Sequence, residues 1–187
     1  MTRIARVALL AAIVAVSAAT ATTAAPGGTS TCRDATLVPT SANAKRIRSA
    51  TLCLLNRQRR SHGLPKLTRD AELLRAAQGY SDQMVTRHFF DHTSPDGSTL
   101  SSRIDRTAYL RNATSWRLGE TIACDDGTRA TPKRTVDKWM STSVHSAQIL
   151  NPHFRDIGIG ATPGTPKPGG GPGATYTAVF GARAPRR

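Results

Sequence analysis

The stretch from residue 88 to residue 97, HFFDHTSPDG, separates a helical first half of the sequence from a mixed second half. Pro95 and the Asp-Gly pair that follows it are incompatible with a continuing helix, so this stretch is predicted to be a loop. The loop carries histidine and aspartate side chains, the types that bind metals and transfer protons. We therefore expect functional side chains where the chain leaves its first helices.

Two amphipathic helices are predicted before this loop. The first covers residues 41–61, where apolar residues recur every three or four positions and Gly63 provides a C-terminal stop. The second is expected to begin after an N-cap at Thr68 and to run to about Arg87. Each of the two helices is therefore expected to have one apolar face.

Short helices and strands are predicted after the loop. A short helix is compatible with residues 100–109, and residues 116–123 form a possible strand that places Glu120 among apolar neighbours. The pair Thr131-Pro132 is typical of a helix start, with proline at the first helical position.

The last part of the sequence predicts a hairpin. Residues 157–162 and 176–180 are β-prone apolar runs, and a stretch rich in glycine and proline separates them.

The first 25 residues have the pattern of a secretory signal. Arg3 and Arg6 precede the apolar run 7–16, and small residues follow up to Ala25. The apolar run is about half the ~20 residues that a membrane-spanning helix needs, so we expect it to be removed rather than retained as an anchor. The sequence thus predicts a signal peptide at 1–25, an N-terminal arm at 26–44, a domain at 45–183 and a basic tail at 184–187.

The charge of the chain is strongly positive. Its 187 residues include 26 Lys and Arg against 12 Asp and Glu, a formal charge of +14 that falls to +12 when Arg3 and Arg6 leave with the signal. The length excludes a multidomain enzyme. Because the cations are dispersed and no aromatic–basic stacking motif accompanies them, an anionic envelope polymer or lipid headgroup is a more economical partner than nucleic acid. The mature chain is expected to be a secreted monomer without a transmembrane segment.

The chain has only three cysteines, and export to an oxidising compartment would allow two of them to form a disulfide. Cys32, Cys53 and Cys124 lack the C-x-x-C spacing of a thiolate zinc site. Three pairings are open, and we favour a disulfide between Cys32 and Cys53, which would tie the N-terminal arm to the first helix. Cys124 is then left over.

Six segments, taken in order, resemble the CAP superfamily of cysteine-rich secretory, antigen 5 and pathogenesis-related proteins, and in particular its bacterial SCP-like branch. The resemblance covers residues 51–181. The segments are LCLLN at 52–56, FDHTSP at 90–95, LGETIA at 118–123, WMS at 139–141 with His145 beyond it, FRDIGIG at 154–160 and YTAVFG at 176–181.

The resemblance implies an α+β fold, a three-layer α-β-α sandwich with a mainly antiparallel central sheet, and a histidine–glutamate cleft. By motif matching, His92 and His145 correspond to the cleft histidines and Glu120 to a cleft glutamate. Two imidazoles and a carboxylate could bind Zn²⁺ or another divalent cation and leave a position open for water. Many eukaryotic members carry a second glutamate where this chain has Thr142.

Several interpretations of these residues remain open at this point. His92, Glu120 and His145 could hydrogen-bond one another and fix the loops, hold a metal, or act in catalysis with Glu120 as the candidate base. His88 and His92 also resemble the histidine pair of the inverted zincins, and Ser94 could be proposed as a nucleophile. The sequence favours an extracellular binding module; the alternative is a metal-dependent extracellular hydrolase that acts on peptides.

Overall fold

The structure is a computed structural model that describes residues 31–169 and 172–185. The predicted signal peptide, the first part of the arm and the last two residues of the basic tail lie outside the described residues. The part from Cys32 onward forms one compact unit. None of the described helices combines the length and the hydropathy that crossing a membrane requires.

Five α-helices and four strands make up this unit. The helices are α1 (Ala44–Ser61), α2 (Ala71–Thr86), α3 (Leu100–Asp105), α4 (Pro132–Met140) and α5 (Ser143–Ile149). The strands are β1 (Thr68–Arg69), β2 (Ala113–Asp126), β3 (Asp156–Pro163) and β4 (Gly173–Pro185), and two short 3₁₀ helices cover Ser41–Asn43 and Gly127–Ala130.

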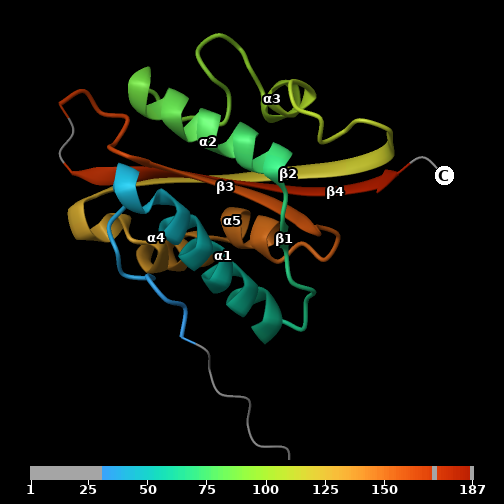
Figure 1. Ribbon diagram of the computed structural model, residues 1–187, viewed down its shortest axis with the longest axis horizontal. Helices are drawn as coiled ribbons and strands as arrows, with labels where there is room; N and C mark the ends of the chain where they lie inside the picture. Colours follow the sequence, from blue (N-terminus) through green and yellow to red (C-terminus); the bar gives the residue numbers. More distant parts are fainter. Residues whose placement is uncertain (1–30, 170–171, 186–187) are drawn as a thin grey trace, which may run out of the picture. The chain divides into compact units, whose positions relative to one another are not determined.

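The elements form three layers, as predicted (Figure 1). The sheet has the order β1-β3-β4-β2, in which β3, β4 and β2 are antiparallel neighbours and β1 is parallel to β3. Helices α2 and α3 cover one face of the sheet, and α1, α4 and α5 cover the other. The expected α+β sandwich with a mainly antiparallel sheet is therefore confirmed, and so is the closing hairpin.

The start of α2 differs from the prediction. Thr68 belongs to β1, where its N–H donates to the Arg155 carbonyl at 2.8 Å, and so it does not cap the helix. The N-cap is Asp70, whose carboxylate accepts from the N–H groups of Glu72 at 2.8 Å and Leu73 at 3.0 Å. A short strand and a cap cannot be separated by composition alone, because threonine is favourable in both.

The two faces of β3 pack in different ways. A side chain at Gly158 or Gly160 would overlap the backbone of Leu73 or Ala77, so these glycines allow α2 to lie directly on the strand. Ile157 and Ile159 are buried in the larger core cluster, on the face toward α1 and α4. The alternation of glycine and isoleucine in β3 thus fits a helix close to one face and a packed core on the other.

The predicted disulfide is present between Cys32 and Cys53, with 5.7 Å between the two Cα atoms. It joins the N-terminal arm to α1. Cys124, on β2, is a free and half-buried cysteine.

Candidate functional site

Two of the predicted site residues, His92 and Glu120, meet at β2, the edge strand at the opposite end of the sheet from β1. Helices α3 and α5 lie on opposite faces of the sheet, and both contact β2. A side chain at Gly119 would overlap Gln148 of α5 and come within 2.7 Å of the Phe154 ring, so this glycine faces α5. Its neighbour Glu120 points to the other face, because successive residues of a strand alternate. Gly119 therefore allows α5 to pack closely on one face of the sheet, and Glu120 places a carboxylate on the other face.

Glu120 is engaged by two side chains. Its side chain is 3% exposed, with Oε1 lying 2.8 Å from His92 Nδ1 and Oε2 accepting a hydrogen bond from Arg103 Nη2 at 2.8 Å. A buried carboxylate is stable only when its charge is compensated and its oxygens are hydrogen-bonded. Arg103 and His92 together satisfy both conditions.

Arg103 also fixes the loop that carries His92. Its Nη1 donates to the carbonyls of His92 at 3.2 Å and Ser98 at 3.0 Å, and its Cζ lies 3.4 Å from the centre of the Tyr80 ring. The Tyr80 hydroxyl in turn donates to the Asp91 carbonyl at 2.7 Å. Backbone carbonyls on both sides of the loop are thus bound by side chains from α2 and α3.

Sequence reasoning missed Arg103 and Tyr80. Arg103 was one of many dispersed cations, and Tyr80 was one member of an apolar helix face. The only available signal was that both residues lie on the inner faces of predicted helices, which is also where core residues lie.

The hydrogen bond to Glu120 determines the state of the His92 ring. A carboxylate only accepts, so Nδ1 carries the proton and Nε2 is free to accept or to bind a metal when the ring is neutral. The same hydrogen bond raises the pKa of His92, while partial burial works against this. The His92 side chain is 54% exposed, so Nε2 belongs to an imidazole that solvent can reach.

His145 approaches from the opposite layer on α5. Its Nδ1 lies 2.6 Å from the hydroxyl of Thr142. Thr142 is the residue that stands where many eukaryotic CAP proteins have a second glutamate. Burial lowers the pKa of His145, and the nearby charges of His92 and Lys138 lower it further. No hydrogen bond joins His145 to Glu120 or to His92 in the described structure.

The predicted set is therefore brought together in part. His92 and Glu120 are in contact, whereas His145 has a partner of its own. Within residues 31–169 and 172–185, no group of three or more His, Cys, Asp or Glu side chains has an arrangement that could hold a metal ion.

The remaining candidates in the loop have structural partners. Ser94 is buried, and its hydroxyl donates to the Asp96 carboxylate at 2.7 Å, which fits the turn role of an ST motif rather than a nucleophile. His88 lies beyond the end of α2, and its Nδ1 is 3.2 Å from the Pro166 carbonyl. Because His88 is not helical, it does not form the helix-borne zincin pair with His92.

The layers and the histidine–glutamate pair at the edge strand define a domain of the SCP-like class. The chain belongs to the CAP family, the cysteine-rich secretory protein family, which it matches over residues 52–180.

The uncharacterized protein YkwD of Bacillus subtilis is 32% identical over 137 residues, which cover 73% of this chain and 49% of that protein. This chain thus spans about half the length of that relative. An extracellular protein containing an SCP domain from Bacillus anthracis is similar in structure, with a TM-score of 0.55, 25% identity and coverage of 74% of this chain and 40% of that one. An outer surface protein from Borrelia burgdorferi has the same fold, with a TM-score of 0.56, 22% identity and coverage of 70% of this chain and 87% of that one.

Proposed function

We propose that this chain is an exported, non-catalytic CAP domain that binds an anionic polymer of the cell envelope and can take a divalent cation between His92 and His145. The observation that carries the non-catalytic part is the state of Glu120. Both of its oxygens are bonded within the protein, and one of them accepts from a buried guanidinium. A general base must reach the proton that it removes, and the Glu120 side chain is 3% exposed with both oxygens directed at protein donors, so it has little access to a substrate.

Export is supported by three independent features. The first 25 residues have the pattern of a cleaved signal. The Cys32–Cys53 disulfide suits an oxidising compartment. The similar Bacillus anthracis structure is described as an extracellular protein.

The donor set fits a cation bound by imidazoles better than one bound by Glu120. A histidine that binds a metal through one ring nitrogen commonly donates its other N–H to a carboxylate, as His92 does to Glu120. His92 Nε2 and a ring nitrogen of His145 would then be the protein ligands, and Glu120 would orient His92. A bound cation would supply Lewis acidity, while the residues of this chain would hold the imidazoles in place.

An anionic polymer fits the charge of the exported chain. The predicted mature chain has a formal charge of +12, spread over its surface, and dispersed cations favour polyanions without a sequence code. Competition between a teichoic-acid-type polymer and duplex DNA distinguishes envelope binding from general polyanion binding. Preference for the envelope polymer at equal charge concentration supports the proposal, and equal or stronger binding of DNA contradicts it.

Calorimetric zinc titration tests the cation part. We expect binding by the wild type, loss of binding in His92→Ala/His145→Ala, and weaker binding in Glu120→Gln. His62→Ala/His153→Ala serves as the control because it removes two exposed histidines elsewhere. Zinc affinity that survives in His92→Ala/His145→Ala contradicts the cation site. Peptide cleavage by the zinc-loaded wild type that is lost in this variant contradicts the non-catalytic assignment.

A further inference from the structure

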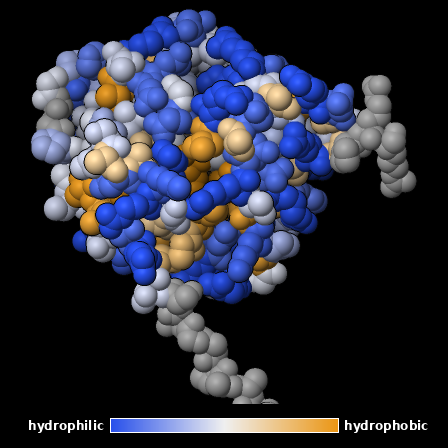
Figure 2. All heavy atoms as spheres, in the orientation of Figure 1, coloured by the Kyte–Doolittle hydropathy of each residue, from blue (hydrophilic) through white to orange (hydrophobic). Residues whose placement is uncertain are grey.

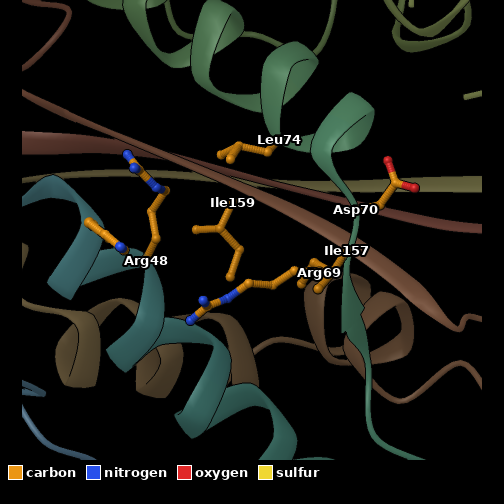
Figure 3. Close-up of a pocket in the computed structure, with 7 residues that line it drawn as sticks. Arg48, Arg69, Asp70, Leu74, Ile157 and Ile159 are labelled. Carbon is orange, nitrogen blue, oxygen red and sulfur yellow. The ribbon is translucent and has the colours of Figure 1, made fainter. Parts of the chain in front are cut away.

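A groove lies at the other end of the sheet from His92 and Glu120. It runs between α1 and α2 beside β1 and β3, and it has a volume of about 190 Å³ (Figure 3). Its lining residues are Lys45, Arg48, Arg69, Asp70, Leu74, Ile157 and Ile159. In the space-filling view, apolar side chains lie at the bottom of a hollow in the middle of this face, bordered by hydrophilic ones (Figure 2).

The groove exists because β1 is only two residues long. Thr68 and Arg69 pair with Asp156 and Ile157, and beyond them the outer edge of β3 has no strand beside it in the described part of the chain. Helices α1 and α2 lie on opposite faces of the sheet and leave this edge open between them (Figure 1).

The open edge also presents a polar backbone group. The Ile157 carbonyl accepts from the Asp70 N–H at 3.0 Å, and the Ala161 N–H donates to the Gln78 side chain at 3.2 Å. Because backbone groups of a strand alternate in direction, the N–H and C=O of Ile159 face the same edge. Strand β1 pairs only with Asp156 and Ile157, and no side chain of the described residues bonds to Ile159, so a ligand in the groove has a donor and an acceptor available.

The floor of the groove is apolar. Leu74 of α2 points toward Ile159 of β3, with Ile157 beside the β1 end (Figure 3). Cavities of roughly 150 Å³ with walls of this kind hold a benzene molecule. The volume of this groove therefore suits one aromatic ring or a branched group of about six to eight carbons.

The rim of the groove is positively charged. Lys45 and Arg48 come from α1, and Arg69 comes from β1. None of the ion pairs among the described residues includes these three cations. Arg69 donates to the Ser49 hydroxyl at 2.7 Å, and Arg48 makes a long contact with Gln78 at 3.4 Å. Their charges are thus left uncompensated around an apolar floor.

The single carboxylate in the lining is already in use. Asp70 caps α2 by accepting from the Glu72 and Leu73 N–H groups, and its second oxygen lies 3.4 Å from Arg183. Its charge is shared with Arg183, and one carboxylate against Lys45, Arg48 and Arg69 leaves the rim with an excess of positive charge.

We infer that this groove binds a carboxylate carried on a compact apolar group, with the apolar group on Leu74 and Ile159 and the carboxylate among Lys45, Arg48 and Arg69. Arginine recognises planar carboxylates with a pair of parallel N–H donors, which favours this anion. Such a ligand could be a free aromatic acid or the C-terminal residue of a peptide, since both present the same chemistry.

Binding of N-acetyl-phenylalanine to the disulfide-bonded protein tests this inference, followed by NMR on leucine and isoleucine methyl groups. We expect saturable shifts at Leu74 and Ile159, and at least a ~10-fold weaker affinity for the matching carboxamide, because it lacks the charge. Phenylacetate and a tripeptide ending in phenylalanine distinguish the two sources, and tighter binding by either one identifies the source.

Two variants separate the charge from the cavity. Arg48→Gln/Arg69→Gln is expected to weaken binding ~10-fold or more, whereas Arg57→Gln/Arg60→Gln removes the same charge from exposed positions of α1 outside the groove and should have little effect. Leu74→Trp fills the cavity without changing the charge and should abolish the shift at Ile159. Equal affinity for acid and carboxamide, equal effects of the two double variants, or binding only to anionic lipid vesicles would overturn the inference.

Discussion

Arg103 and Glu120 form a buried ion pair that joins α3 to the edge strand β2. The Nη2–Oε2 distance is 2.8 Å, and the two side chains are 7% and 3% exposed. The other Glu120 oxygen contacts His92, while Arg103 also binds two carbonyls of the His92 loop. One ion pair thus connects the sheet, a helix and the loop with the exposed histidine.

Glu120→Gln is expected to destabilise the protein by about 3 kcal/mol, because it leaves the buried charge of Arg103 uncompensated. Urea unfolding measures the change. Asp105→Asn is the control, since Asp105 is exposed at the end of α3. If Glu120→Gln lowers the free energy of unfolding by less than about 1 kcal/mol, the Arg103–Glu120 pair does not stabilise the fold as a buried ion pair should.

Tyr80 predicts a specific loss of stability at alkaline pH. Burial raises the pKa of Tyr80 from 10.0 to about 12. The fold therefore favours the neutral phenol, and the stability it contributes is complete below pH 10 and is lost as the pH rises from 10 to about 12. Urea unfolding of wild type and Tyr80→Phe across this range measures the difference.

The Tyr80→Phe protein should be less stable at pH 8 by about 1 kcal/mol, since it lacks the hydrogen bond to Asp91. The difference in free energy of unfolding between wild type and Tyr80→Phe should become smaller above pH 10, because ionisation of the buried phenol then destabilises the wild type. A difference that stays constant through this range would contradict the raised pKa of Tyr80.

The disulfide should stabilise the fold through the unfolded state. Replacing Cys32 and Cys53, which are 21 positions apart, by serine is expected to cost about 3 kcal/mol. Thermal unfolding with and without reductant measures this, and the double variant should be insensitive to reductant. Cys124→Ser should melt like the wild type, because Cys124 is free. A reductant effect that depends on Cys124 instead would refute the pairing.

Gly119→Ala should disturb the contact between β2 and α5. The new methyl group would overlap Gln148 and come within 2.7 Å of the Phe154 ring, so we expect a loss of about 1–3 kcal/mol and a shift of α5 with His145. Gly79→Ala is the matched control, since nothing lies within 4 Å of its added carbon and it sits in a helix. That control should gain about 0.5–1 kcal/mol. Unfolding curves and the His145 NMR signals report both effects.

Local sequence patterns predicted most of the helices and strands, but they did not predict where each one begins and ends. The apolar spacing predicted α1 and α2, two β-prone runs predicted the β3–β4 hairpin, and Thr131-Pro132 marked the start of α4. The beginning of α2 was misplaced, because Thr68 is a plausible cap and only its pairing with β3 makes it a strand residue.

The candidate site divides in the same way. His92, Glu120 and His145 could be found because they lie in short motifs. Arg103 and Tyr80 could not, since an inward-facing arginine and an inward-facing tyrosine have no local signature before their partners are known.

The sequence by itself predicted most of the helices and strands, favoured one of three possible cysteine pairings, and indicated the family. Only the tertiary structure decided that Glu120 is held by Arg103 and His92, that His145 pairs with Thr142, and that a cationic groove opens beside β1. The physical reason is the distance along the sequence between the residues that interact. Periodicity and capping depend on neighbours within a few positions, whereas the charge state of a buried carboxylate and the shape of a groove depend on layers that come together only when the chain folds.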